Sequence, residues 1–217
     1  MPWDRSMPPP ATTGQLFIVS APSGVGKSTI IRTVIASCPN LKFSVSCTTR
    51  PIRPGEVTGK DYHFLSMEEF LRGISSGRFL EWAEVHGHLY GTDRRLVEKW
   101  LKAGDDVLLD IDVQGARLVH CAYPAAPTIF ILPPSMHVLE ERLRNRATET
   151  EEQLVIRVAA ARRELLESPW YDYIIINDNL QEAVDDLKAI LRAGRSSRAI
   201  QAARLKNFLM SLLNPNA

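Results

Sequence analysis

The feature of the sequence that most constrains its fold is a short glycine-containing segment between a strand pattern and a helix pattern. Leu16 to Ser20 is an apolar, β-branched run of the kind that forms a buried strand. A helical pattern begins at about Lys27 and continues to Ser37. Between the two, the chain reads Ala21, Pro22, Ser23, Gly24, Val25, Gly26, Lys27, Ser28 and Thr29. Small residues here let successive backbone N–H groups curve around a phosphate, so we predict a phosphate-binding loop.

Two side chains of the loop and one strand-end carboxylate have expected roles toward a nucleotide. Lys27 would reach the β- and γ-phosphates, and the Ser28 hydroxyl would bind Mg²⁺. Asp110 lies near the end of the strand pattern from Val107 to Asp112, where such folds place a carboxylate close to the metal. A loop of this kind usually opens with glycine, and the Ala21 methyl is tolerated if it points away from the phosphates. We therefore expect Mg²⁺ with Ser28 and Asp110 as its protein contacts.

The remaining strand and helix patterns alternate along the chain, which is typical of an α/β fold. Further buried-strand patterns occupy residues 107–112, 128–132 and 173–177. Helical patterns follow them at residues 114–122, 135–146 and 180–192. This order predicts a P-loop NTPase-type core, with a parallel sheet covered by helices on both faces.

Two segments interrupt the alternation. Residues from about 41 to 92 are rich in Thr, Gly, Pro and aromatic side chains, so we expect an inserted, strand-rich lobe. Within it, Ser66 and Glu69 have the spacing of a capping box that begins a helix. The second segment, about residues 142–166, is unusually rich in arginine.

The two ends of the chain differ from the body at residues 15–192. Residues 1–14 contain three consecutive prolines and no apolar signal-peptide core, which indicates a disordered leader. Residues 193–217 carry basic side chains and no acidic one. Their apolar residues repeat with the period of an amphipathic helix: Leu205, Phe208, Leu209, Leu212 and Leu213.

The composition excludes several classes of function. Lys and Arg (26) nearly balance Asp and Glu (25), whereas a protein that coats nucleic acid is usually more basic. The three cysteines form no C-x-x-C pair, so we expect neither a disulfide framework nor a zinc site. Reduced thiols favour a cytoplasmic location, and no apolar run is long enough to span a membrane. We expect no nucleic-acid or membrane partner.

A phosphate-binding loop is compatible with GTPases, motor ATPases and small-molecule kinases, so the second ligand has to be inferred from the inserted lobe. The lobe carries guanidinium, ammonium and phenol groups suited to a second phosphate: Arg50, Arg53, Lys60, Tyr62 and Tyr90. Polar and acidic residues accompany them: Ser46, Glu56, Glu81 and Thr92. A solvated, salt-bridged loop would have the same composition, and the residues alone leave both interpretations open.

Several longer runs resemble the guanylate kinase family in order and spacing. They are SAPSGVGKST, SVSCTTRPIRPGEVTGKDYHF, GRFLEWAEVHGHLYGT, LLDIDVQGA, RNRATETEEQLVIR and IIINDNL. The match covers about residues 15–192, and the second run is much more specific than the phosphate loop. The resemblance implies transfer of the ATP γ-phosphoryl group to GMP. Bacterial members commonly open the loop with alanine, as this chain does at Ala21.

The resemblance also implies roles for individual residues of the lobe. The GMP phosphate would bind Arg50, Arg53, Tyr62 and Tyr90. Glu56 would lie beside them and support the arginines. Guanine would be recognised by Glu81, with Ser46, Thr92 and Asp112 completing the base site.

On the donor side, the resemblance implies that ATP binds the loop, with Asn177 at the adenine. The arginine-rich segment at about residues 142–166 would be a mobile lid that closes when both nucleotides are bound. Its arginines at the transferring phosphate would be Arg142, Arg146 and Arg157. The catalytic residues implied are Lys27, Arg50, Arg142 and Arg157.

Two alternatives stay open at this level. A catalytically inactive guanylate-kinase-like module would bind protein partners, although the complete loop with Lys27 and the lid arginines count against it. A kinase of the same fold would use a different phosphorylated acceptor, although Glu81 with Ser46 favours guanine. The expected partners are ATP and GMP, and the amphipathic tail is compatible with a homo-oligomer.

Overall fold

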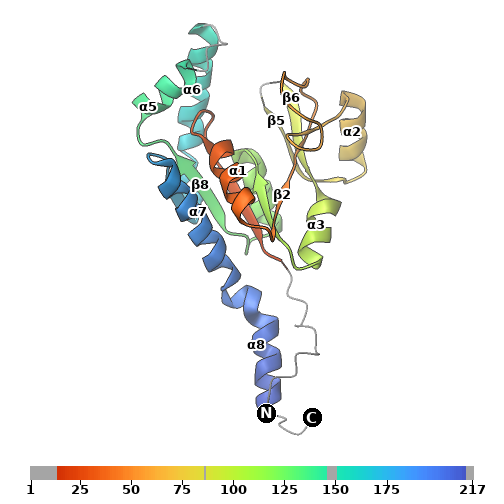
Figure 1. The fold of residues 1–217 in the computed structure, drawn as a ribbon. Helices are drawn as coiled ribbons and strands as arrows, with labels where there is room; N and C mark the ends of the chain where they lie inside the picture. Colours follow the sequence, from red (N-terminus) through yellow and green to blue (C-terminus); the bar gives the residue numbers. More distant parts are fainter. Residues whose placement is uncertain (1–13, 86, 146–150, 214–217) are drawn as a thin grey trace.

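A five-stranded parallel sheet forms the centre of the molecule (Figure 1). The structure is a computed structural model and describes residues 14–85, 87–145 and 151–213. The strand order is β2 (Leu41–Ser44), β7 (Asp106–Asp110), β1 (Leu16–Ser20), β8 (Thr128–Leu132) and β9 (Tyr173–Ile176). The predicted strands at residues 16–20 and 128–132 are confirmed in both bounds. β7 and β9 end before the predicted residues 112 and 177, because those polar residues make contacts outside the sheet.

Helices cover both faces of this sheet. One face packs against α1 (Lys27–Ser37) and α7 (Leu180–Arg195), and the other against α3 (Arg94–Lys102) and α4 (Val113–Ala122). The central strand β1 serves both faces, because successive side chains of a strand point in opposite directions. Phe17 and Val19 are buried with the first pair of helices, and Leu16 and Ile18 with the second. The predicted α/β fold is therefore confirmed.

A second sheet of four strands forms the inserted lobe. Its order is β4 (His63–Phe64), β3 (Cys47–Thr48), β6 (His88–Asp93) and β5 (Phe79–Val85). The helix α2 (Met67–Ser75) contributes the buried Phe70, whose ring stacks on Phe79 with 4.3 Å between centroids. The predicted capping box at Ser66 and Glu69 is confirmed, since each side chain accepts a hydrogen bond from the other residue's backbone N–H.

The lobe begins later than the residue 41 expected from composition. β2 pairs with β7 in the central sheet, and Leu41 is buried in the core beside α1. Burial of this apolar residue joins β2 to the central sheet, so the strands of the lobe itself begin at Cys47.

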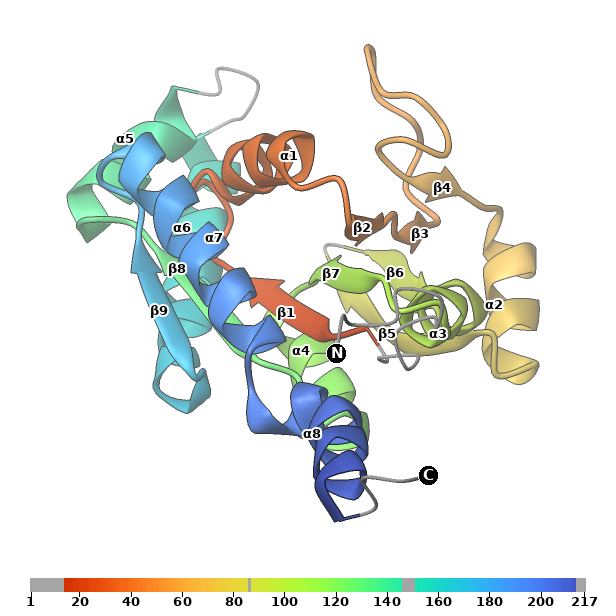
Figure 2. The ribbon, with the colours of Figure 1, turned by 60° about the horizontal axis from the view of Figure 1, so that its bottom comes forward.

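The arginine-rich segment lies across α1 from the lobe (Figures 1 and 2). It spans the end of α5 (Met136–Arg144) and all of α6 (Glu151–Leu165). The two helices share an apolar cluster of Leu139, Leu143, Leu154 and Ala161. A short 3₁₀ turn (Ser168–Trp170) leads from α6 to β9. The phosphate-binding loop, which precedes α1, therefore lies between the lobe and this helix pair.

The C-terminal segment forms the helix α8 (Arg198–Leu213), which continues from α7 away from the central sheet (Figure 1). The predicted helix is thus present, and its apolar side chains are exposed: Leu205, Phe208, Leu209, Leu212 and Leu213. Within the described ranges, no helix combines the length and apolar character needed to cross a membrane. Self-association through this helix stays a prediction.

Substituting a core residue tests the packing of the sheet. Phe130 on β8 is fully buried, with its ring centroid 4.8 Å from that of Tyr171. We expect Phe130→Ala to lower the free energy of unfolding by about 3–5 kcal/mol, because it removes buried apolar surface and leaves a cavity. Urea denaturation measures the change. Leu118→Ala, at a position of α4 that is 53% exposed, is the control and should cost at most about 0.5 kcal/mol. Equal losses in the two variants would contradict this packing.

Candidate nucleotide site

The loop between β1 and α1 has a backbone shape that requires its glycines. Gly24 and Gly26 have φ angles of 91° and 99°, a region that residues with side chains avoid. A Cβ atom at Gly26 would lie 2.6 Å from the side-chain nitrogen of Asn177. One at Gly24 would lie 2.8 Å from a methyl carbon of Leu143. The loop can therefore turn, and approach α5 and β9 closely, only without side chains at these positions.

Two polar side chains from distant parts of the sequence hold the carbonyl oxygen of Val25. Asn177 donates to this oxygen from Nδ2 over 2.6 Å, and Arg142 donates from Nη1 over 3.1 Å. Arg142 also donates from Nη2 to the carbonyl oxygen of Asn177 over 3.1 Å. Asn177 follows β9 and is buried, whereas Arg142 comes from α5. The shape of the loop thus depends on residues 117 and 152 positions away in the sequence.

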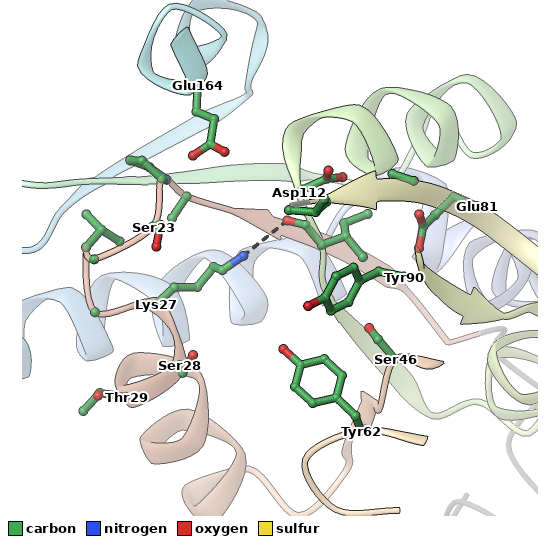
Figure 3. Close-up of a pocket in the computed structure, with 18 of the residues that line it drawn as sticks. Ser23, Lys27, Ser28, Thr29, Ser46, Tyr62, Glu81, Tyr90, Asp112 and Glu164 are labelled. Atoms are coloured by element: carbon green, nitrogen blue, oxygen red, sulfur yellow. Dashed lines mark hydrogen bonds between the residues drawn. The ribbon is translucent and has the colours of Figure 1, made fainter. Parts of the chain in front are cut away.

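Lys27 extends from the start of α1 toward the end of β7 (Figure 3). Its Nζ lies 2.5 Å from Oδ1 of Asp110 and donates to the carbonyl oxygen of Ile111 over 3.3 Å. Both members of the ion pair are only about one-fifth exposed (19% and 21%). The ammonium group is therefore held next to the loop, where it would meet a bound anion.

A cavity of about 300 Å³ connects the loop to the inserted lobe (Figure 3). Residues 21–29 line it on the loop side. On the other side it is lined by side chains predicted for the second nucleotide: Ser46, Tyr62, Glu81, Tyr90 and Asp112. The structure therefore brings the predicted ATP loop and part of the predicted GMP site to one cavity.

A buried arginine lies beside this cavity. Arg50 donates from Nη2 to Oε1 of Glu56 over 2.7 Å, and this bond lowers the pKa of Glu56. Glu56 also accepts from the backbone N–H of Arg53 over 2.8 Å. The Arg50 guanidinium lies 5.2 Å from the ring centroid of Tyr62, which is 5.9 Å from that of Tyr90. Glu56 and the Tyr62 ring thus orient Arg50. Among the described residues that line the cavity, neither Arg50 nor Arg53 is found.

Glu81 is a buried carboxylate at the lobe end of the cavity. Its side chain is on β5, and its Oε1 accepts from the hydroxyl of Thr92 over 2.6 Å. Burial raises the pKa of Glu81 to about 7; the bond from Thr92 opposes the shift, and the nearby Asp112 adds to it. Asp112 caps α4 by accepting from the backbone N–H of Gly115 over 2.7 Å. The hydrogen bond from Thr92 therefore stabilises the ionised form of Glu81 only in part, and burial still disfavours the negative charge.

The helix α6 presents two side chains to the loop and the cavity from one of its faces. Arg157 donates from Nη2 to the hydroxyl oxygen of Ser23 over 2.6 Å. Glu164 lines the cavity on the side of the loop, and burial raises the pKa of its carboxyl group (Figure 3). The two residues are seven positions apart, which places them on the same side of a helix. α6 therefore contacts the loop through Arg157 and brings the Glu164 carboxyl group to the same cavity.

Comparison with known proteins places this chain in a family. The family model described as guanylate kinase matches residues 13–194. The chain belongs to the guanylate kinase family. The guanylate kinase of Symbiobacterium thermophilum is 49% identical over 197 residues, covering 91% of this chain and 93% of the relative. That of Thermotoga maritima is 46% identical over 199 residues, covering 92% and 96%. The crystal structure of guanylate kinase from Anaplasma phagocytophilum is 36% identical, with a TM-score of 0.73, covering 86% of this chain and 88% of that one.

The predicted site residues fall into groups by position. The loop residues line the cavity together with Ser46, Tyr62, Glu81, Tyr90 and Asp112. Four others support those residues or lie beside them: Arg50, Arg53, Glu56 and Thr92. Three further predicted residues contact the loop itself: Arg142, Arg157 and Asn177. A contact between Asn177 and the adenine of ATP stays a prediction. Arg146 lies outside the described residues.

Glu164 lines the cavity but was not among the predicted site residues. A usable signal was present, because Glu164 follows Arg157 by seven residues in a helical pattern and so shares its face. The pattern by itself did not say that this face meets the loop. That contact depends on how α6 packs against α5.

The side chains available for a metal at this site are oxygen donors. Ser28 is exposed at the start of α1, and the Asp110 carboxylate lies at the end of β7 beside Lys27. Mg²⁺ prefers oxygen ligands and usually takes few from the protein, using phosphates and water for the rest. The hydroxyl and the carboxylate therefore fit Mg²⁺ bound together with a nucleotide. In the part of the chain that the structure describes, no group of three or more His, Cys, Asp or Glu side chains could hold a metal without such help.

The raised pKa of Glu81 predicts that Glu81→Gln stabilises the nucleotide-free protein. Folding raises this pKa from 4.5 to about 7, so the folded state binds the proton more tightly and stability falls as pH rises through that interval. Glutamine does not ionise, so the variant avoids this loss of stability. The increase in melting temperature of Glu81→Gln over the unsubstituted protein should therefore be larger at roughly pH 8 than at pH 5. Thermal melts measure it. Glu84→Gln, at an exposed position of the same strand, should show no comparable pH-dependent gain. A gain for Glu81→Gln that does not vary with pH would contradict the burial effect.

Proposed function

We propose that this protein transfers the γ-phosphoryl group of ATP to GMP, giving ADP and GDP. The observation that carries the proposal is one cavity lined both by a phosphate-binding loop and by the buried carboxylate of Glu81. Phosphoryl transfer depends mainly on placing two anionic groups in line and offsetting their charge. Membership of the guanylate kinase family supports the same reaction.

ATP would bind with its phosphates in the loop, against backbone N–H groups and the N-terminus of α1. Lys27 would contact the β- and γ-phosphates from its place beside Asp110. Arg157 already contacts Ser23, and Arg142 the carbonyl oxygen of Val25, so both guanidinium groups lie close to the loop. Positive charge there would stabilise the transferring group, whose negative charge is spread over its equatorial oxygens. We assign Arg146 to the same lid cluster and Asn177 to the adenine.

The GMP phosphate would bind on the lobe side of the cavity. Arg50 is held in place by Glu56 and by the ring of Tyr62, which reduces the ordering cost of binding an anion. Arg53 and the hydroxyls of Tyr62 and Tyr90 would complete the site. The second pKa of a phosphate monoester is about 6, so the attacking oxygen is mostly deprotonated at neutral pH. No general base is required.

Guanine would be recognised by Glu81. The base offers N1–H and N2–H₂ as adjacent donors, which one carboxylate accepts together, whereas adenine presents a bare N1 acceptor there. Such a bidentate contact is worth about 1–3 kcal/mol of discrimination. A buried carboxylate left unpaired by the wrong base would add to that difference. Thr92, Ser46 and Asp112 would complete the base site, since Thr92 holds Glu81 and the other two line the same cavity.

Mg²⁺ is the proposed cofactor, with Ser28 and Asp110 as its protein contacts. When bound, it offsets negative charge on the β- and γ-phosphates. The segment at about residues 142–166 would close over both nucleotides and exclude water, which is the competing acceptor. We also propose a cytoplasmic location, supported by the reduced thiols of Cys38, Cys47 and Cys121.

A coupled assay for ADP release tests the function directly. ADP production from ATP should depend on added GMP and should be much slower with AMP, UMP or dTMP. Glu81→Gln should lower kcat/KM for GMP about 10–100-fold, the factor that corresponds to 1–3 kcal/mol. Glu84→Gln, exposed on the same strand, is the control and should retain activity.

Each negative result in this assay has a definite meaning. No ADP release with any of the nucleoside monophosphates would favour the inactive binding module. Faster release with another acceptor would favour a different kinase of the same fold. An unchanged kcat/KM for GMP in Glu81→Gln would remove Glu81 from guanine recognition.

A further inference from the structure

We propose that Gly115 is a positioning residue for guanine recognition, because the absence of a side chain there leaves room for the Glu81 carboxylate. This inference rests on the proposed function and concerns a residue to which the sequence analysis assigned no role. Gly115 lies in the first turn of α4 and is buried against β5.

The space that a side chain would need at Gly115 is already occupied. A Cβ atom at this position would lie 2.6 Å from Oε2 of Glu81 and 3.1 Å from both its Cδ and Oδ1 of Asp112. Glu81 is itself only 6% exposed. The Glu81 carboxylate therefore packs directly against the backbone of α4. It does so at Gly115, the only residue in the first turn of this helix without a Cβ atom.

The helix itself does not require glycine at this position. Gly115 lies within α4, and its φ is outside the left-handed region occupied by Gly24 and Gly26. Alanine is a better helix former than glycine, so helix propensity favours the substitution. The requirement for glycine therefore comes from Glu81 and not from the local backbone.

Two contacts on opposite sides fix the Glu81 carboxylate. The Thr92 hydroxyl holds Oε1 over 2.6 Å, and the backbone of Gly115 bounds Oε2. Gly115 also donates its N–H to Oδ1 of Asp112 over 2.7 Å, so it adjoins both carboxylates of the base site. Figure 3 shows Glu81 and Asp112 at the cavity from two different elements. The position of Gly115 thus sets where the guanine-binding oxygens stand.

A methyl group at Gly115 would move Glu81 more readily than it would move the fold. The atom in its way is the end of a flexible side chain, which can rotate without disturbing the core. Gly194 in α7 is a useful contrast, because a Cβ there would lie 2.7 Å from both a ring carbon of Phe17 and Oε1 of Gln15. Phe17 is fully buried in the central core. A methyl group at Gly194 would therefore fit only if core residues or the helix α7 moved.

Gly115→Ala is the test, with Gly194→Ala as its matched control. We expect Gly115→Ala to raise KM for GMP at least tenfold and to narrow the preference for GMP over AMP. Its KM for ATP should change less than twofold, and its melting temperature should be equal or higher. Gly194→Ala should show the reverse, with a lower melting temperature and an unchanged preference for GMP. Retained GMP preference in Gly115→Ala, or a melting-temperature loss as large as that of Gly194→Ala, would overturn the proposal.

A double-mutant cycle with Glu81→Gln shows whether Gly115 acts through Glu81. Residues in direct contact give non-additive effects, so Gly115→Ala should cost less than twofold in kcat/KM for GMP when Glu81 is already glutamine. Multiplied losses in the double variant would overturn the inference while leaving the proposed function in place. Unchanged GMP preference in Glu81→Gln alone would instead show that the proposed function of Glu81 is wrong.

Discussion

The hydrogen bonds to the carbonyl oxygen of Val25 are the interaction on which the rest of the site depends. They come from Arg142 on α5 and from Asn177 after β9, so three separate parts of the chain meet at one atom. These two bonds fix the backbone of the loop at Val25, and a loop of successive backbone N–H groups is the kind of structure that binds phosphate. The parallel sheet makes the meeting possible, because the loop and Asn177 both follow carboxyl ends of its strands.

The cations around the cavity are paired with carboxylates, whereas the buried Glu81 carboxylate has no cation as a partner among the described residues. Lys27 is paired with Asp110, and Arg50 with Glu56, so each of these cations is positioned by a carboxylate before any ligand binds. Glu81 accepts from a hydroxyl instead and has no ion-pair partner among the described residues. A buried carboxylate without a cation costs stability, and binding sites commonly carry such a cost. Ligand donors that reach Glu81 would recover part of it.

The helix α6 is linked to the loop through Ser23. Arg157 donates to the hydroxyl oxygen of this residue, and Glu164 lines the adjoining cavity from the same face of α6. A displacement of α6 has to break the contact of Arg157 with Ser23 or carry the loop with it. The helix of the proposed lid is therefore in direct contact with the predicted ATP loop. This coupling follows from the packing of α6 on α5 through Leu139 and Leu154.

The sequence by itself determined the local elements and the chemistry of the phosphate loop. Apolar periodicity and the glycine spacing at Gly24 and Gly26 act within a few residues, so they could be recognised directly in the chain. Only the tertiary structure decided that β2 belongs to the central sheet, that Glu164 lines the cavity, and that Gly115 adjoins Glu81. These contacts join distant parts of the chain, and no local pattern specifies which face of one element meets which face of another. Long-range packing makes that choice, because burial of apolar surface depends on all the elements together.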